Sequence, residues 1–278
     1  MIAGGRNNTD RGHEVSVERL STRKAKTFVD THCHCLPQLD DGPGSIDEAI
    51  SLCRTLVEDN VCTVVATPHQ LGRFENRTSA AMIHQATRRL NEELDERGIE
   101  LTVLPGAEVR LDERIAELLA RHEVLTLADA GRHVLLELPW DVFIDVEPLL
   151  VRFVSEGVDP IIAHPERNGP LLGRIEALRR WLSCGISLQV TASSLTGHFG
   201  PQAQRAAWSL VAERWVDTIA TDAHDRHSHP PCMAAAYEMI AADIGHNVAR
   251  LLCAENPSRI ARGERLVPAC MLDRQEVW

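Results

Sequence analysis

The sequence predicts an α/β fold in which seven strands and their connecting helices form a barrel. Seven short apolar runs occur along the 278-residue chain, and a run that is apolar throughout is typical of a parallel strand buried on both faces. Amphipathic segments of helical periodicity separate these runs, which is the pattern of consecutive β-α units. The length suits one (β/α) barrel, and seven alternating units favour a closed or nearly closed barrel over an open sheet.

The elements follow in chain order. The predicted strands are Thr27–Asp30, Val61–Ala66, Leu101–Leu104, His133–Leu138, Pro160–Ala163, Ile186–Val190 and Val216–Ala220. The predicted helices are Ile46–Glu58, Ser79–Glu96, Arg114–Arg121, Val146–Glu156, Arg174–Leu182, Pro201–Arg214, Pro231–Ile244 and His246–Cys253. A capping box of Ser45 and Glu48 begins the first helix. Residues 1–26 lack periodicity and are predicted to be a flexible extension, and residues 27–278, which no linker divides, are expected to form one domain.

Composition excludes several classes of protein. Hydrophobic residues make up 44% of the chain and charged residues 25%, as in a soluble globular protein. The net charge is -11 and no run of lysine or arginine occurs, so we expect no nucleic-acid partner. Eight cysteines without a Cys-x-x-Cys pair indicate reduced thiols. Without a membrane-length apolar run or a signal peptide, the chain is predicted to be cytoplasmic and not membrane-spanning.

Residue types that bind metal ions follow most of the predicted strands. In a (β/α) barrel the C-terminal ends of the strands meet at one end, where the chemistry lies. The candidate ligands there are His32, His34, His69, Glu108, Glu137, His164, Asp222 and His224. Imidazole and carboxylate together suit divalent zinc, manganese and iron. The set exceeds the three or four ligands of one catalytic ion, so we expect a multinuclear site of the kind that hydrolyses phosphate esters.

The remaining histidines lack this placement. A single His-x-His pair would be weak evidence for a metal site, and it is the coincidence at six strand ends that carries the prediction. His133 lies at the beginning of its strand, which is the wrong end. The histidines expected at the surface or in packing are His13, His84, His122, His198 and His246.

Seven segments resemble the PHP family of metal-dependent phosphoesterases, and more closely its branch of bacterial protein-tyrosine phosphatases of capsule and exopolysaccharide synthesis. The segments are DTHCHCLPQLDDGPGSIDEAI, VATPHQLGRFEN, VLPGAEVR, LLELPW, IIAHPERN, VTASSLTGHFG and ATDAH, in order over residues 30–224. The resemblance implies a distorted TIM-like (β/α)7 barrel of the PHP type. It also implies hydrolysis of phosphotyrosine by a metal-activated hydroxide, with a substrate on the tail of a bacterial tyrosine kinase.

The same resemblance implies three divalent ions, with manganese favoured and iron or zinc as alternatives. The implied ligands are His32, His34, Glu108 and Asp222 for the first ion, Glu108, Glu137 and His164 for the second, and Asp41, His69 and His224 for the third. Without the resemblance, the Asp40-Asp41-Gly42 turn indicates only a tight bend. Asp30 would support the site by orienting a histidine ligand.

Family members use arginines to hold the phosphate, and Arg167 in the HPERN segment matches one of them. A guanidinium grips two phosphate oxygens and keeps its charge. The second family arginine falls at His229 here, and nearby Arg226 either replaces it or is an ordinary loop charge. His69 or another site histidine could protonate the leaving group, although a phenolate of pKa ~10 needs little help.

A cysteine-dependent mechanism is the first rival interpretation. Cys253 to Arg259 formally matches Cys-x5-Arg, the phosphate loop of another class of phosphatases. We reject the match because Glu255 would repel phosphate and Pro257 has no N–H to donate. Asn256-Pro257 is better explained as a break between two C-terminal helices.

Two further alternatives concern the substrate and the role. A PHP phosphatase of a small phosphomonoester, such as histidinol phosphate, is the nearest enzyme alternative. The Phe74-Glu75-Asn76 loop and the Thr191–Gly200 segment favour the tyrosine-phosphatase branch. A metal-binding regulatory partner of a membrane-bound kinase is the non-enzymatic alternative, and the complete ligand set argues against it.

Overall fold

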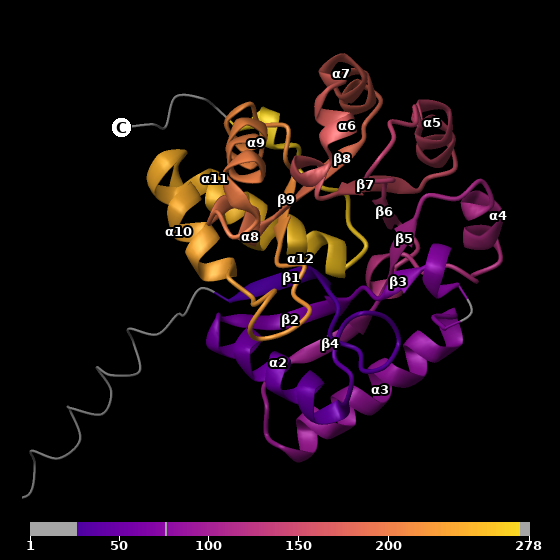
Figure 1. Ribbon diagram of the computed structural model, residues 1–278, viewed down its shortest axis with the longest axis vertical. Helices are drawn as coiled ribbons and strands as arrows, with labels where there is room; N and C mark the ends of the chain where they lie inside the picture. Colours follow the sequence, from indigo (N-terminus) through magenta and orange to yellow (C-terminus); the bar gives the residue numbers. More distant parts are fainter. Residues whose placement is uncertain (1–26, 76, 273–278) are drawn as a thin grey trace, which may run out of the picture.

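The structure, a computed structural model, describes residues 27–75 and 77–272 (Figure 1). The predicted extension over residues 1–26 and Asn76 of the Phe74-Glu75-Asn76 loop therefore lie outside the described residues. Short strands occupy the centre of the described chain, and helices surround them (Figure 1).

All strand pairs among the described residues are parallel, which confirms the predicted α/β class. The strands are β1 (Phe28–Cys33), β2 (Val61–Ala66), β3 (His69–Gln70), β4 (Thr102–Pro105), β5 (Glu108–Arg110), β6 (His133–Glu137), β7 (Asp159–Ala163), β8 (Ser187–Thr191) and β9 (Thr218–Ala220). They form a three-stranded sheet in the order β1-β2-β4 and a six-stranded sheet in the order β3-β5-β6-β7-β8-β9. The strands of residues 27–75 and 77–272 thus form two hydrogen-bonded sheets, whereas one closed or nearly closed barrel was predicted.

Two chain crossings separate the sheets. The chain leaves β2 and enters β3 through Thr67-Pro68, and it leaves β4 and enters β5 through Gly106-Ala107. Pro68 has no N–H for a ladder bond. A Cβ on Gly106 would lie 2.7 Å from Val65 Cγ1, so this close approach requires glycine. At the other edge, a single parallel bridge joins Cys33 to Ala223 after β9.

The helices match the predicted segments to within a few residues at each end. They are α2 (Ile46–Glu58), α3 (Ala80–Glu96), α4 (Ile115–Ala120), α5 (Glu147–Ser155), α6 (Gly169–Leu172), α7 (Ile175–Ser183), α8 (Ala192–Leu195), α9 (Gly200–Ala212), α10 (Met233–Asp243), α11 (His246–Arg250) and α12 (Asn256–Ala261). No range was predicted for the one-turn helices α6 and α8 or for α12. At α2, Ser45 Oγ accepts from the N–H of Glu48 as predicted, whereas the Glu48 carboxylate accepts from the N–H of Gly44 at 2.7 Å.

The C-terminal helices contain the rejected Cys-x5-Arg match. A π-helical turn, Leu251–Glu255, joins α11 to α12, so the helical path continues where a break at Asn256-Pro257 was predicted. Asn256 is buried, and its amide donates to the carbonyl oxygens of Asp217 and Val267. Cys253 is also buried, and burial raises the pKa of its thiol well above the usual range. A buried, protonated thiol inside a helix cannot serve as a phosphate-loop nucleophile.

Two apolar clusters hold the elements together. The larger cluster lies between the sheets and the surrounding helices. The smaller one fills the space between the two sheets and consists of Val65, Leu127, Leu135, Ile161, Ala163 and Ile260. Ile260 belongs to α12, which lies between the sheets in Figure 1. Side chains therefore fill the interior, and chemistry is confined to the strand ends.

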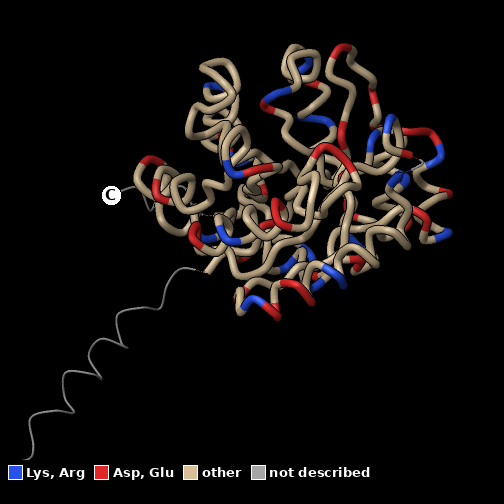
Figure 2. Tube along the Cα trace, turned by 60° about the horizontal axis from the view of Figure 1, so that its bottom comes forward, with Lys and Arg blue, Asp and Glu red and all other residues tan. Residues whose placement is uncertain are grey.

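The described residues show neither a segregation of charge along the elements (Figure 2) nor a membrane-spanning helix. Acidic and basic residues are interspersed along the elements (Figure 2). No helix in residues 27–75 and 77–272 combines the length and the apolar character needed to cross a membrane.

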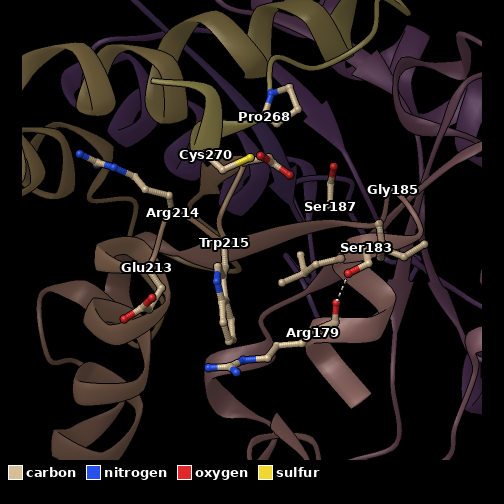
Figure 3. A pocket seen from close by; sticks show the side chains of 12 residues that line it. Arg179, Ser183, Gly185, Ser187, Glu213, Arg214, Trp215, Pro268 and Cys270 are labelled. Carbon is tan, nitrogen blue, oxygen red and sulfur yellow. Dashed lines mark hydrogen bonds between the residues drawn. The ribbon is translucent and has the colours of Figure 1, made fainter. Parts of the chain in front are cut away.

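A cavity of about 590 Å³ lies at the N-terminal ends of β8 and β9 (Figure 3). Its lining includes Trp215, and the guanidinium carbon of Arg179 lies 5.4 Å from the centre of the Trp215 ring. Buried Asp217 also lines it, and burial raises the pKa of this carboxyl to about 6. None of the predicted site residues lines this cavity, which is at the opposite end of the strands from the predicted chemistry.

Candidate metal centre

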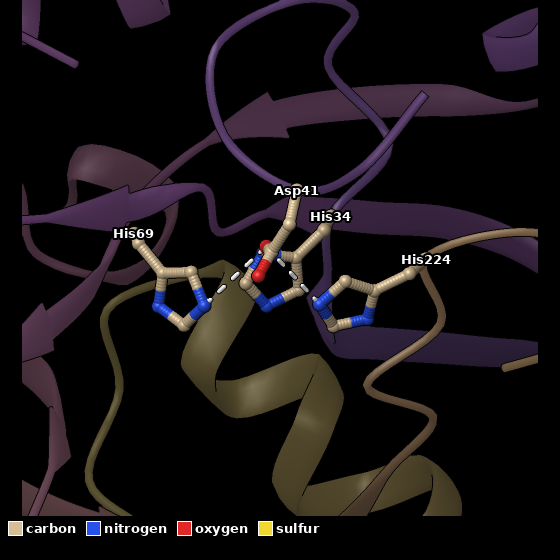
Figure 4. A group of neighbouring side chains, drawn as sticks. All are labelled: His34, Asp41, His69 and His224. Carbon is tan, nitrogen blue, oxygen red and sulfur yellow. Dashed lines mark ion pairs between the residues drawn. The ribbon is translucent and has the colours of Figure 1, made fainter. Parts of the chain in front are cut away.

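Four predicted ligands from three parts of the chain meet at the C-terminal ends of the strands (Figure 4). They are His34 after β1, Asp41 in the following turn, His69 at the beginning of β3, and His224 after β9. One ligand atom from each lies within 4.8 Å of the others. Asp41 lies between two imidazoles, with its Oδ1 at 3.5 Å from Nε2 of both His69 and His224.

Two further groups adjoin this one. His32, His34 and Asp222 form the second, and His69, Glu108 and Glu137 form the third. His164 joins them because its Nε2 lies 2.8 Å from Glu108 Oε1. The structure therefore brings all nine predicted ligands together. The grouping differs from the implied one in three respects. His34 and His69 each belong to two groups, Glu108 is not in the group of His32 and Asp222, and His164 contacts Glu108 without belonging to a group.

Hydrogen bonds behind the imidazoles determine which nitrogen faces the centre. Nδ1 of His32 lies 2.7 Å from Gln189 Oε1, Nδ1 of His34 lies 2.6 Å from Asp40 Oδ2, and Nδ1 of His224 lies 2.9 Å from the carbonyl oxygen of Asp222. Each partner is an acceptor, so Nδ1 carries the proton in all three rings. The Nε2 lone pairs are then directed at the centre, as metal binding requires.

Asp40 and Gln189 are functional residues that sequence reasoning missed. Asp40 was interpreted as part of a tight bend, but its Oδ2 accepts from both the His34 ring and the backbone N–H of His69. Gln189, in β8, has no ligand-type side chain and gave no signal. Asp30, which was expected to orient a histidine ring, instead accepts from the backbone N–H of His32 and from Thr221. Gln189 orients the ring of His32.

Donor chemistry and spacing fit divalent cations. His32 Nε2 and His34 Nε2 lie 3.3 Å apart with both protons committed elsewhere, so two lone pairs face each other. Asp222 Oδ1 lies 3.2 and 3.4 Å from these nitrogens, and Glu108 Oε2 lies 3.5 and 3.6 Å from them. Ligand atoms about 2.1 Å from one ion lie roughly 3–4 Å from each other. His32, His34 and Asp222 would therefore hold one cation, and Glu108 lies beside them.

The carboxylates at the centre are ionised in spite of burial. Burial alone would raise the pKa of Glu108, but neighbouring His32 and His164 outweigh it and hold the pKa well below the usual range. Burial likewise opposes ionisation of Asp222, and His32 and Arg167 lower its pKa well below the usual range. Anionic oxygens beside imidazole lone pairs are the donor set that zinc, manganese and iron prefer.

Arg167 lies at the edge of this centre. The 3-10 turn Pro165–Arg167 follows His164, whose left-handed φ of 36° turns the chain sharply after β7. The Arg167 guanidinium forms an ion pair with Asp222 and lies 4.6 Å above the Phe199 ring. Its Nε is buried and has no hydrogen-bond partner. An unpartnered buried donor is costly, so this atom is available for an anionic ligand at the centre.

The second predicted arginine is not brought to the centre. Arg226 is exposed, and its guanidinium donates to Ser51 Oγ on α2. His229 lies beside the centre instead, with its ring 5.1 Å from the His224 ring and 5.2 Å from the Phe199 ring. The structure therefore favours the interpretation of Arg226 as an ordinary loop charge. His229, at the position of the family arginine, lies next to the ligand cluster.

The histidines predicted to lie outside the site do so where the structure describes them. His84 pairs with Asp129 on the surface, and His198 is exposed, with its ring 6.2 Å from that of His229. His133 is buried at the beginning of β6 without a hydrogen-bond partner for either ring nitrogen. Burial lowers its pKa to about 4. His13 lies outside the described residues.

Fold and site together define a class: a parallel α/β protein with a candidate metal centre of histidines and carboxylates at the C-terminal strand ends. Residues 28–262 match the family described as capsular polysaccharide synthesis, CpsB/CapC, which is most of the chain. The chain belongs to the CpsB/CapC family, which confirms the resemblance to phosphatases of capsule synthesis.

Relatives in this family are tyrosine-protein phosphatases. YwqE of Bacillus subtilis is 32% identical over 241 residues, which are 86% of this chain and 93% of YwqE. CpsB of Streptococcus pneumoniae is 29% identical over 241 residues, which are 84% of this chain and 98% of CpsB. Both carry the name tyrosine-protein phosphatase.

Solved structures agree with this relationship. A structure from the work on YwqE and CpsB, described as unique metal-dependent tyrosine phosphatases, matches with a TM-score of 0.82 at 30% identity and covers 86% of this chain and 97% of that chain. The lactonase Lmo2620 of Listeria monocytogenes matches with a TM-score of 0.53 at 11% identity, over 86% of this chain and 95% of its own. The second likeness concerns the fold alone.

Proposed function

We propose that this chain is a metal-dependent protein-tyrosine phosphatase that acts in the cytoplasm in capsule or exopolysaccharide synthesis. The observation that carries the proposal is the meeting of nine ligand-type residues with the unpartnered, buried Nε of Arg167 in a chain of this family. The proposed substrate is phosphotyrosine on a protein, namely the tail of a bacterial tyrosine kinase.

The proposed cofactors are three divalent ions, with manganese as the first choice. The residues that would hold them are His32, His34, Glu108 and Asp222 for the first ion, Glu108, Glu137 and His164 for the second, and Asp41, His69 and His224 for the third. In the same proposal, the two sheets are one distorted (β/α)7 barrel of the PHP type, opened where Pro68 and Gly106 interrupt its strands, and residues 27–278 form one domain.

The residues of the chain have separable tasks in this reaction. When bound, divalent ions supply Lewis-acid activation of water and neutralise phosphate charge. Arg167 donates from its guanidinium to phosphate oxygens, and Phe199 supports the guanidinium plane. Gln189 and Asp40 keep the Nε2 atoms of His32 and His34 directed at the centre. A tyrosine leaving group has pKa ~10, so its departure needs little protonation, and His69 is the proposed donor if one acts.

Measurements of phosphate release with two substrates and three preparations of the protein test this function. The wild-type chain with manganese is expected to hydrolyse a phosphotyrosine peptide in preference to histidinol phosphate. Chelation is expected to abolish the activity, because the cluster then loses its cations. Cys253→Ser is expected to retain it, because the thiol is buried in a helix. Preference for histidinol phosphate would refute the proposed substrate, and loss of activity in Cys253→Ser with resistance to chelation would refute the metal mechanism.

A further inference from the structure

A pocket of about 320 Å³ opens beside the candidate metal centre. It shares His69 and Glu137 with the centre, and its lining also includes Phe74, Trp140, Arg73 and Arg110. Ligand pockets begin at about this size and combine apolar walls with a few polar groups. A phosphate held at the centre would therefore direct the group attached to it into this pocket.

Two stacks of rings connect the wall of the pocket to one buried carboxylate, Glu108. The Phe74 ring stacks on His69 at 5.4 Å with an angle of 5°, and the Trp140 ring stacks on His164 at 4.9 Å with an angle of 14°. Both histidines contact Glu108, through His69 Nδ1 at 2.9 Å and His164 Nε2 at 2.8 Å. The two aromatic rings that line the pocket thus each stack on a histidine that contacts Glu108.

Interactions with Glu137 hold the Trp140 ring in place. The indole Nε1 of Trp140 donates to Glu137 Oε1 at 3.0 Å, and Arg110 Nη1 lies 2.7 Å from the same oxygen. The Trp140 ring is nevertheless 42% exposed, whereas Phe74 is 8% exposed. An exposed tryptophan that is oriented by a buried carboxylate presents a large flat surface for a ligand at little cost in side-chain entropy.

Basic side chains border the same opening. Arg73 forms an ion pair with Asp41, and its guanidinium carbon lies 4.5 Å from the centre of the Phe74 ring. Arg73 is 71% exposed at its side chain, and Arg110 is 30% exposed. Two cations beside two aromatic rings suit a ligand that carries a phosphate on an aromatic ring.

We propose that this pocket is the subsite for the aromatic ring of an aryl phosphate, and that Phe74 and Trp140 are the residues that select phosphotyrosine over alkyl phosphomonoesters. The inference rests on the proposed function and adds the source of its selectivity. A phenyl ring in the pocket contacts both aromatic side chains, whereas the shorter, non-planar chain of an alkyl phosphate leaves them uncovered. The selectivity therefore resides outside the metal ligands.

The test compares kcat/KM for phenyl phosphate with kcat/KM for glycerol 2-phosphate in the manganese-loaded full chain. Comparing this ratio between a variant and the wild type cancels the intrinsic difference between the leaving groups and any change common to both substrates. Trp140→Ala is expected to lower the aryl-to-alkyl ratio about 10-fold, which is the scale of one well-packed aromatic contact. Phe74→Leu, which keeps an apolar side chain at the more buried position, is expected to lower the ratio less, about 3-fold.

The variant Trp140→Phe distinguishes the contact that the ring makes with the substrate from the hydrogen bond that the indole donates to Glu137. This variant keeps an aromatic ring but loses the Nε1 hydrogen bond, so the ratio is expected to stay close to that of the wild type even if both rates fall. Val142→Ala, on the same exposed loop, and Trp215→Ala, at the cavity of Figure 3, are matched controls whose ratio is expected to be unchanged. An equal loss of ratio in Trp140→Phe and Trp140→Ala would overturn the proposal.

Binding supplies a second readout that does not depend on turnover. Affinities for phenylphosphonate and methylphosphonate are measured by calorimetric titration. Trp140→Ala is expected to lower the affinity for phenylphosphonate about 10-fold and to change the affinity for methylphosphonate little. If the wild-type chain fails to hydrolyse a phosphotyrosine peptide, the proposed function fails. If it hydrolyses the peptide but the ratio is unchanged in both Trp140→Ala and Phe74→Leu, only the aromatic subsite is refuted.

Discussion

Asp40 and Asp41 are neighbours in sequence but have different positions at the centre. Asp41 offers an oxygen to His69 and His224, whereas Asp40 lies behind His34 and accepts its Nδ1 proton at 2.6 Å. A carboxylate behind an imidazole fixes the tautomer of the ring and increases its basicity as a ligand.

Replacing Asp40 with asparagine should weaken metal binding without removing a ligand. An amide oxygen in the place of Oδ2 can still accept from the His34 ring and from the N–H of His69, but the amide NH2 then faces the N–H of Gly42, where Oδ1 of Asp40 accepts. A neutral amide also increases the basicity of the ring less than a carboxylate does. We expect Asp40→Asn to lower manganese affinity about 10- to 100-fold, as measured by calorimetry on the metal-free chain. Asp47→Asn, on the exposed first turn of α2, is the matched control. Equal affinity in both variants would show that Asp40 does not support the ligand.

At this scale, strand-end placement predicted eight of the nine candidate ligands, whereas Asp41 was predicted only through the resemblance to the family. Neither predicted Asp40 or Gln189 as supporting residues. Histidine and carboxylate after a parallel strand carry a recognisable signal, which is how Glu108 and His164 were found. Gln189 carries none, because an amide in a buried strand becomes a positioning group only through a partner 157 residues away. Arg226 and His229 are separated by three positions in one loop, and only the folded loop distinguishes them.

The turn between β1 and α2 is the element that delivers both Asp40 and Asp41. Its geometry depends on Gly42, because a Cβ at that position would lie 2.2 Å from the carbonyl oxygen of His34. The backbone N–H of Gln38 donates to the carbonyl oxygen of Pro43 and closes the turn. The turn therefore packs directly against the strand end that supplies His34.

Gly42→Ala should displace this turn and with it two carboxylates. The contact is with backbone, which cannot move away as a side chain can, so we expect fewer bound manganese ions per chain by elemental analysis and a lower Tm. Gly44→Ala is a close control, because a Cβ there meets only the flexible end of Glu48 at 3.4 Å. Wild-type metal content in Gly42→Ala would contradict this view of the turn.

Periodicity predicted most elements of the fold but not how the strands are shared between sheets. The extents of α2 and β2 match the prediction because apolar spacing reports burial directly. The switch of neighbours at Pro68 and Gly106 is a property of packing between distant segments, and the short strands β3 and β5 that follow are too brief to show a period. The two sheets therefore had to be seen in three dimensions.

The candidate metal centre joins the two sheets of the whole molecule. His32 lies in β1 of the first sheet and His34 follows that strand, whereas Glu108 and Glu137 belong to the second sheet. Among the described residues, only the pair Cys33–Ala223 bridges the strands outside the named ladders. Cations held between ligands from both sheets would therefore act as cross-links at the open end, while the apolar cluster around Ile260 closes the interior.

Removal of metal should loosen the molecule at this end first. When the free metal concentration is 100 times the dissociation constant of a site, binding at that site adds about 2.7 kcal/mol to the free energy of unfolding. We therefore expect chelation to lower the Tm and manganese to restore it. Hydrogen exchange should increase at the ends of β1 and β9 and in the turn containing Asp41, while α12 stays protected because its contacts are apolar. A uniform increase in exchange across both sheets would mean that the ions stabilise the whole fold, and an unchanged Tm would mean that they do not link the sheets.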